Sequence, residues 1–97
     1  GVASLVPGTA LAPEAILAFT LEKGSAQAGE RVRGRAEWED PSGDTLVAIV
    51  DTKTGTAVLA RDLVTYWGRL PGRDTVSIRV ANNLNLSDQK DLVIVIR

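Results

Sequence analysis

Alternation of apolar and polar residues along two segments is the strongest pattern in the chain. Residues 30–39 place a charged side chain at nearly every second position, with Val, Gly, Ala and Trp between them. This period of two is typical of a half-buried β-strand with one charged face. Residues 75–81 repeat the pattern, and one face there carries Val76, Ile78 and Val80. Both segments therefore predict strands, and we expect Trp38 to point into the core.

Clusters of turn-forming residues divide much of the remaining chain into short segments. Pro, Gly, Asp, Ser and Thr gather at residues 40–44, 51–55 and 69–74, where they favour β-turns and hairpin loops. The segments between and after these clusters are rich in apolar and β-branched residues, which predicts further strands at 46–50, 56–61, 63–67 and 92–96. Residues 82–91 are dense in Asn, Asp and Ser, so we expect a polar loop there.

The N-terminal part of the chain allows two interpretations. Residues 15–22 fit a strand whose one face carries Leu17, Phe19 and Leu21, and we favour this interpretation. The same segment fits a short helix, because Pro13 stands where a first helical position would be. Before it, residues 2–6 predict a further edge strand.

Six or seven short strands, spaced by turns about every ten residues, indicate an all-β fold, an antiparallel sandwich of two packed sheets. The chain has 97 residues, which is the size of one domain, because two halves would each be too small to bury a core. We therefore expect a single domain over residues 1–97, with residues 1–14 as an edge strand or a covering segment. An α+β domain with one short helix near Pro13 is the alternative.

The order of these segments resembles that of bacterial and phage immunoglobulin-like domains. The resemblance rests on the strand after Ala28-Gly29-Glu30, the turn at Pro41-Ser42-Gly43, and Leu70-Pro71-Gly72 before the penultimate strand. It spans residues 15–97 and implies a sandwich of about seven strands. The chain departs from antibody-type domains because it has no cysteine pair and because Trp38 lies one strand earlier than their core tryptophan.

Composition and charge remove most catalytic and electrostatic functions. Eleven basic and twelve acidic side chains give a net charge of -1, which weakens the case for nucleic acid or an anionic membrane. The chain has no Cys and no His, so it lacks thiolate chemistry and the commonest general base and metal ligand. No apolar run approaches the roughly 20 residues of a membrane-spanning helix. We expect no enzymatic activity, no cofactor, no nucleic-acid partner and no membrane insertion.

Two polar clusters are better explained by structure than by ligand binding. Asp40 and Asp44 bracket one predicted loop, and residues 82–91 hold further Asn and Asp side chains. Calcium accepts such oxygens, but the spacing fits no EF-hand, and turn chemistry explains these residue types.

Arg31, Arg33 and Arg35 share one strand face that continues into two glutamates. A solvated face with cross-strand ion pairs is the favoured interpretation of that stripe.

The apolar segments 46–50 and 92–96 are the most informative feature for function, because both are apolar on two faces. A sandwich strand normally has one solvated face, so a second apolar face needs a cover. In the last strand we assign Leu92, Ile94 and Ile96 to the interior. Val93 and Val95 then require a cover, either residues 2–11 or another subunit or domain.

These observations predict a non-catalytic structural or adhesive module of a larger extracellular, cell-surface or virion protein. Its partner would be a protein, either a neighbouring domain or another subunit, and a second copy of the chain is one such subunit. The alternative is a carbohydrate- or small-ligand-binding module that uses Tyr66 or Trp67, since adjacent strand residues point to opposite faces and only one of the two can be buried. The candidate interface residues are therefore Val93, Val95, Tyr66 and Trp67.

Overall fold

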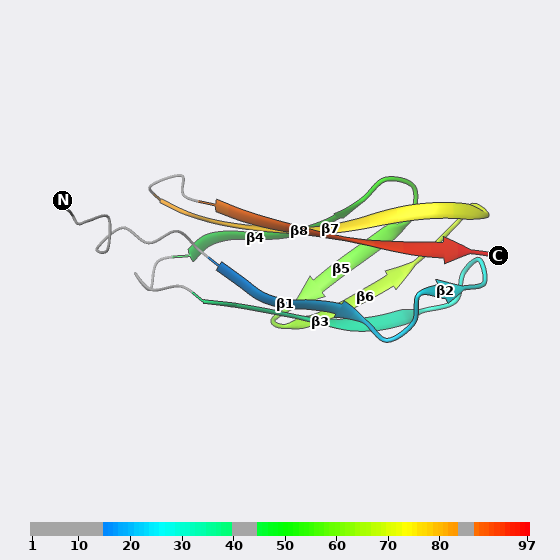
Figure 1. The fold of residues 1–97 in the computed structure, drawn as a ribbon, viewed down its shortest axis with the longest axis horizontal. Coiled ribbons are helices and arrows are strands. Elements are labelled where there is room, and N and C mark those ends of the chain that lie inside the picture. Colours follow the sequence, from blue (N-terminus) through cyan, green and yellow to red (C-terminus); the bar gives the residue numbers. More distant parts are fainter. Residues whose placement is uncertain (1–14, 40–44, 84–86) are drawn as a thin grey trace.

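The computed structural model describes residues 15–39, 45–83 and 87–97 and places most of them in two β-sheets (Figure 1). The described residues contain no helix, which confirms the all-β prediction and the strand interpretation of the segment after Pro13. Their eight strands are β1 (Ala15–Leu21), β2 (Ser25–Ala26), β3 (Val32–Glu39), β4 (Thr45–Thr52), β5 (Thr56–Ala60), β6 (Leu63–Trp67), β7 (Gly72–Asn82) and β8 (Ser87–Ile96).

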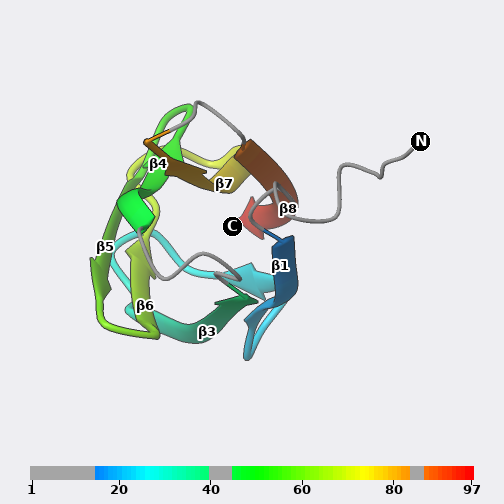
Figure 2. The ribbon, with the colours of Figure 1, turned by 90° about the vertical axis from the view of Figure 1, so that its left-hand side faces the viewer.

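The strands form two four-stranded sheets that face each other. The first sheet has the order β1-β3-β6-β5 and the second has the order β2-β8-β7-β4. Figure 2 looks along the strands and shows β1 beside β8 on one side of the sandwich and β4 beside β5 on the other. The predicted pair of packed sheets is therefore confirmed. The expectation of purely antiparallel pairing is wrong, because β2 runs parallel to β8; a strand of two residues is too short to leave a period in the sequence.

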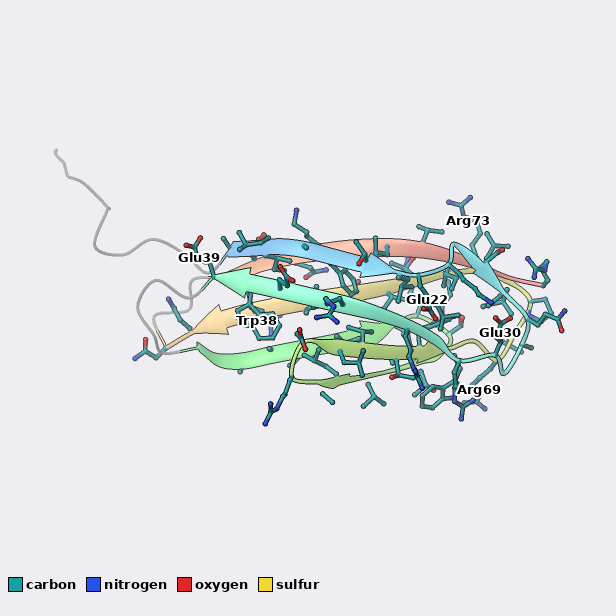
Figure 3. All side chains as sticks on the ribbon, turned by 90° about the horizontal axis from the view of Figure 1, so that it is seen from below. Glu22, Glu30, Trp38, Glu39, Arg69 and Arg73 are labelled. Atoms are coloured by element: carbon teal, nitrogen blue, oxygen red, sulfur yellow. The ribbon has the colours of Figure 1, made fainter. Side chains whose placement is uncertain are left out.

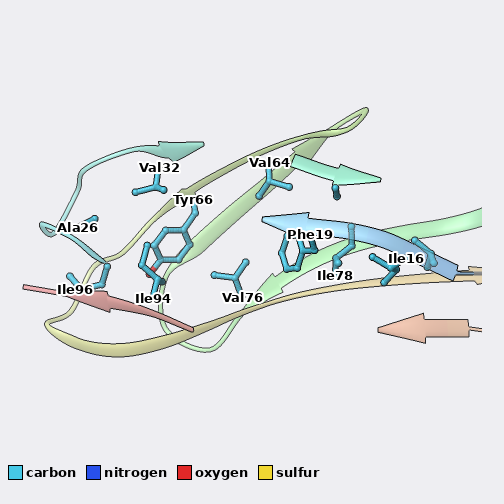
Figure 4. Close-up of a cluster of buried hydrophobic side chains, with 12 residues drawn as sticks. Ile16, Phe19, Ala26, Val32, Val64, Tyr66, Val76, Ile78, Ile94 and Ile96 are labelled. Carbon is cyan, nitrogen blue, oxygen red and sulfur yellow. The ribbon is translucent and has the colours of Figure 1, made fainter. Parts of the chain in front are cut away.

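The core consists of the inward side chains of both sheets (Figure 4). Val32 and Ala36 of β3 are fully buried, and their charged neighbours on the strand are exposed. The predicted inward face of β7 is likewise fully buried, which confirms both alternation patterns. The other buried apolar residues of this cluster are Ile16, Phe19, Ala26, Val64, Tyr66, Ile94 and Ile96.

Trp38 points inward as predicted but is only partly buried. It shares the face of Val32 and Ala36 and packs against the core cluster. It is the last inward residue of β3, so it lies at one end of the sandwich, where fewer strands surround it (Figure 3). The direction of the side chain was therefore predictable, whereas its degree of burial depended on the length of the neighbouring strands.

The predicted facing of β1 is wrong at Leu17. The register of β1 against β3 shifts between Ile16 and Ala18, which is the signature of a β-bulge. The bulge places Ile16 and Phe19 on the buried face, and it leaves Leu17 61% exposed. Simple alternation cannot predict this, because one inserted residue moves the side chains beyond it to the opposite face.

The polar loop predicted at residues 82–91 is also wrong over most of its length. β7 continues to Asn82 and β8 begins at Ser87, and Ala81 pairs with Ser87. Backbone groups make the ladder hydrogen bonds, so a solvated strand tolerates polar side chains that composition assigns to a loop. The predicted edge strand at residues 2–6, the cover at residues 2–11 and the turn at 40–44 lie outside the described residues.

Candidate functional site

The outer face of the second sheet carries two of the predicted interface residues. Ile94 and Ile96 of β8 are buried, and Leu92 packs against the core, so the inward face is the predicted one. Val93 and Val95 point away from the core and are 49% and 40% exposed. They lie opposite Thr75 and Arg73 of β7. Nothing in the described residues covers them, and their role as a contact surface stays a prediction.

A shallow hollow on the same outer face lies between β4, β7 and β8. It has a volume of about 310 Å³ and is lined by Ile49, Asp51, Thr52, Lys53, Thr75, Ser77, Arg79 and Gln89. Asp91 lies opposite Ser77 on β8. Hydrogen bonds from Ser77 and Gln89 lower the pKa of the Asp91 carboxyl, so this group is anionic at neutral pH. The outer face therefore combines exposed aliphatic side chains with charges of both signs.

The outer face of the first sheet carries the arginine stripe, and two of its members have partners there. Arg35 forms an ion pair with Asp62 at 2.9 Å. Arg31 lies over the ring of Trp67, with 4.1 Å from its guanidinium carbon to the ring centroid, and it donates to the Gly29 carbonyl. Arg33 is exposed on the same face. The stripe is solvated as expected, but within the described residues Arg35 alone of its three arginines forms an ion pair, and its partner lies in the turn between β5 and β6 and not on a facing strand.

Tyr66 is fully buried, so its assignment as a candidate surface residue is wrong. It lies on β6, an inner strand of the first sheet between β3 and β5, and its ring fills the space between the sheets. Its hydroxyl donates a hydrogen bond to Asp74 Oδ2 at 2.7 Å. Trp67, the next residue, is half-buried, and Arg31 covers part of its ring.

Asp74 is a buried carboxylate that the sequence interpretation missed. It is 2% exposed, and besides Tyr66 it accepts hydrogen bonds from the backbone N–H groups of Gly55 at 2.8 Å, Thr54 at 3.0 Å and Thr75 at 2.8 Å. Burial acts to raise the pKa of Asp74, but the four hydrogen bonds outweigh it and lower the pKa. Burial and the bond to Asp74 raise the pKa of Tyr66.

The hydrogen bonds of Asp74 give it a structural role. They tie the turn between β4 and β5 to β6 and β7, and every donor that surrounds the carboxylate is used. The position of Asp74 along β7 could have identified it as buried. Asp74 stands two residues before Val76, and side chains two residues apart on a strand point to the same face, which here is the buried face of β7.

Asp88 makes a second structural contact that the sequence interpretation missed. Its Oδ2 accepts a hydrogen bond from the Ile16 backbone N–H at 2.8 Å, which links β1 of the first sheet to β8 of the second. The described residues include no group of three or more acidic side chains placed to hold a metal ion. Asn85 lies outside the described residues.

A second hollow lies beside Trp38 at one end of the sandwich. It has a volume of about 390 Å³ and is lined by Ala36, Glu37, Trp38, Arg61 and Asp62. It holds no arrangement of a nucleophile beside a base, and Asp62 is already paired with Arg35.

No family model matches the chain, and no curated protein matches it. The described residues form no helix long and apolar enough to cross a membrane.

Proposed function

We propose that the chain is an immunoglobulin-like module that acts by protein–protein contact and spacing within a larger extracellular, cell-surface or virion protein, of bacterial or phage type, and that it is not an enzyme. Its contact surface is the outer face of the second sheet around Val93 and Val95.

The strand order supports the immunoglobulin-like part of this proposal. Constant-type immunoglobulin domains place their first, second, fifth and fourth strands in one sheet and their third, sixth and seventh in the other. If the two-residue β2 is set aside, the order β1-β3-β6-β5 against β8-β7-β4 has the same arrangement. The chain differs from antibody domains because it has no cysteine for a disulfide between the sheets, and its core contains a buried hydrogen bond between Tyr66 and Asp74.

The observation that carries the proposed contact is the exposure of Val93 and Val95 on a strand whose other face is core. Single exposed aliphatic residues are common, but this face also presents Ile49, which is 47% exposed. Apolar side chains with a polar surround are the usual composition of a protein–protein contact surface. The alternative is a carbohydrate-binding module that uses Tyr66 or Trp67. It is weakened because the Tyr66 side chain is buried in the core, which leaves only the half-buried Trp67 as a candidate for contact with a sugar.

Sedimentation of the wild-type chain at increasing concentration tests this proposal, in roughly 300 mM salt so that contacts between exposed charges are screened. We expect the wild type to self-associate side by side and V93E/V95K to remain a folded monomer. The matched control is V58E/L63K on the outer face of the first sheet, where the two residues are 49% and 42% exposed. The control should associate as the wild type does.

Two results would contradict the proposed contact. One is a wild type that stays monomeric at every concentration while V93E/V95K behaves as the wild type does. The other is equal loss of association in V58E/L63K, which would show that added charge and not the position of the two valines is responsible. A saturable change of tryptophan fluorescence on titration with glycans would favour the carbohydrate-binding alternative instead.

A further inference from the structure

One end of the sandwich is rich in basic side chains. At the end where β8 finishes, the loops before and after β2 and the loop between β6 and β7 come together, and the Gly29 N–H donates to the Gly68 carbonyl. Figure 3 shows Arg69 and Arg73 at this end with Glu22 and Glu30. We name it the basic end; its charged residues are Glu22, Lys23, Glu30, Arg31, Arg69, Arg73 and Arg97.

The two acidic residues of the basic end are already engaged there. Glu30 forms an ion pair with Lys23 and accepts the Gln27 N–H, and the bond to Lys23 is the main reason that the pKa of Glu30 is lowered. Glu22 accepts the backbone N–H of Arg33 at 3.2 Å.

The arginines of this end differ in their contacts. Arg31 is held over Trp67, and Arg97 donates to the Ser25 hydroxyl at 2.8 Å. Arg69 and Arg73 are exposed, and within the described residues neither has a hydrogen bond or an ion pair. The basic end thus presents two guanidinium groups that can bind carboxylates without breaking an existing contact.

The opposite end of the sandwich presents unpaired carboxylates. Glu37 and Glu39 are exposed near the C-terminal end of β3, and within the described residues neither has an ion pair. Figure 3 shows Glu39 at the far end from Arg69 and Arg73. Arg61 is the nearby cation, since it lines the same hollow as Glu37. We name this the acidic end. Glu14, Asp40 and Asp44, which are its neighbours in sequence, lie outside the described residues.

We propose that copies of this module associate end to end, with Arg69 and Arg73 of one copy contacting Glu37 and Glu39 of the next. Charge complementarity supports this occupant, because the two unpaired arginines and the two unpaired glutamates lie at opposite ends of one molecule. Such a contact is heterologous, and repeated copies extend into a chain of modules instead of closing into a dimer. It adds a second contact to the proposed function, and the two contacts share only the position of Arg73, which lies opposite Val95 at the edge of the outer face of the second sheet.

The test is a charge-swap pair studied by small-angle X-ray scattering and sedimentation. R69E/R73E makes both ends acidic, and E37R/E39R makes both ends basic. We expect the wild type to associate at low salt with a large increase in its longest dimension, as end-to-end contact requires. Its affinity should fall by about tenfold between roughly 20 mM and roughly 300 mM salt, because exposed charge pairs are screened. Each variant alone should show no increase of its longest dimension at low salt, although it keeps the side-by-side contact through Val93 and Val95. An equimolar mixture of the two should elongate again.

The matched control is R33E/K90E, which makes the same change of net charge as R69E/R73E at exposed positions that belong neither to the two ends nor to the outer face around Val93 and Val95. It should associate as the wild type does. Failure of the mixture to associate, or equal loss in the control, would overturn the end-to-end contact. Binding of the basic end to a polyphosphate without self-association would assign it to a polyanion instead and would also overturn the proposal. Side-by-side association that is lost only in V93E/V95K, with no increase of the longest dimension at low salt, would support the proposed function while contradicting this inference.

Discussion

Asp74 is the residue on which the interior of the molecule depends most strongly. It places a charge inside a sandwich whose other buried residues are mainly aliphatic, and it does so without an ion pair. Four donors surround it, two of them from the turn between β4 and β5. A buried carboxylate is tolerated only when its hydrogen-bonding capacity is used in this way. The arrangement therefore holds the turn between β4 and β5 against β6 and β7.

Replacing Asp74 with Asn should lower the free energy of unfolding by about 2–4 kcal/mol. The Asn side chain is neutral, and its NH2 group would point a donor at backbone N–H groups, which are donors themselves. The folded pKa of Asp74 is lowered, so the unfolded chain takes up the proton first. The carboxylate's stabilisation is therefore complete above pH about 4, the ordinary Asp value, and is lost as pH falls through the folded pKa.

Urea unfolding from neutral pH down to about pH 2 measures this dependence. D74N should show a shallower loss of stability in acid than the wild type does. D51N is the matched control, because Asp51 is exposed and accepts only the Thr52 N–H among the described contacts; it should leave both stability and its acid dependence nearly unchanged. An acid dependence in D74N as steep as that of the wild type would show that other groups cause it.

Trp38 tests the facing of β3 at the level of a single side chain. Full truncation of a core aromatic residue costs about 3–5 kcal/mol, and Trp38 is only partly buried. We therefore expect Trp38→Ala to cost about 2–3 kcal/mol, toward or below the lower limit of that range. Chemical denaturation gives the value. A loss below about 0.5 kcal/mol, typical of surface sites, would mean that Trp38 does not pack on the core.

At the scale of elements, alternation predicted the strands that are long and have one solvated face. β3 and β7 lie close to the two segments expected from the period-two pattern, because burial alone decides which side chains they turn inward. β6 matches the segment 63–67, which its apolar and β-branched residues predicted. β1 was misassigned at Leu17 because a bulge depends on pairing with β3 and leaves no local signal. β8 was too short in the prediction because its first half is polar and is held by backbone pairing to β7.

The candidate site was predictable only in part for the same reason. Strand periodicity places Val93 and Val95 together on one face, and the larger size of Leu92, Ile94 and Ile96 assigns the other face to the interior. The burial of Tyr66 and the role of Asp74 depend on partners that are distant in sequence, among them Thr54 and Gly55. Residue pairing of this kind is set by the packing of the two sheets, which composition and periodicity do not encode.

The turn between β5 and β6 offers a test at the scale of an element. Ala60 pairs with Leu63, so Arg61 and Asp62 form a two-residue hairpin loop, and Arg61 has a φ of 59°. Glycine suits such a position, because it has no Cβ to clash. Arg61→Gly should raise the free energy of unfolding by up to about 1 kcal/mol in spite of the greater freedom of the unfolded chain.

Arg69→Gly is the matched control for this turn. Arg69 is an exposed loop arginine whose φ is not positive, so glycine there brings only added freedom of the unfolded chain and should lower the melting temperature slightly. Thermal unfolding of the two variants side by side checks the expectation. A loss of stability in Arg61→Gly as large as that in Arg69→Gly would mean that the turn carries no strain.

At the scale of the whole molecule, two sheets, two outer faces and two ends have distinct properties. The interior is joined by the apolar cluster, by Asp74 and by the Asp88 contact between the sheets. The outer face of the first sheet carries the arginine stripe together with exposed Val58 and Leu63, and that of the second carries Val93, Val95 and Ile49 beside charges of both signs. The proposed role in protein contact rests on the second of these faces, where the exposed valines lie on a strand whose other face is core.

The central claim is that Val93 and Val95 are free in the single chain and available to a partner, and the stability of V93E/V95K tests it most directly. The free energy of unfolding is measured for the wild type and the variant over a wide range of protein concentration. In dilute solution we expect the two values to agree within about 0.5 kcal/mol, because exposed positions tolerate charge. At high concentration only the wild type should gain stability, since association stabilises the folded state. A loss of several kcal/mol by the variant in dilute solution would contradict the claim, because it would mean that the chain's own residues bury both valines.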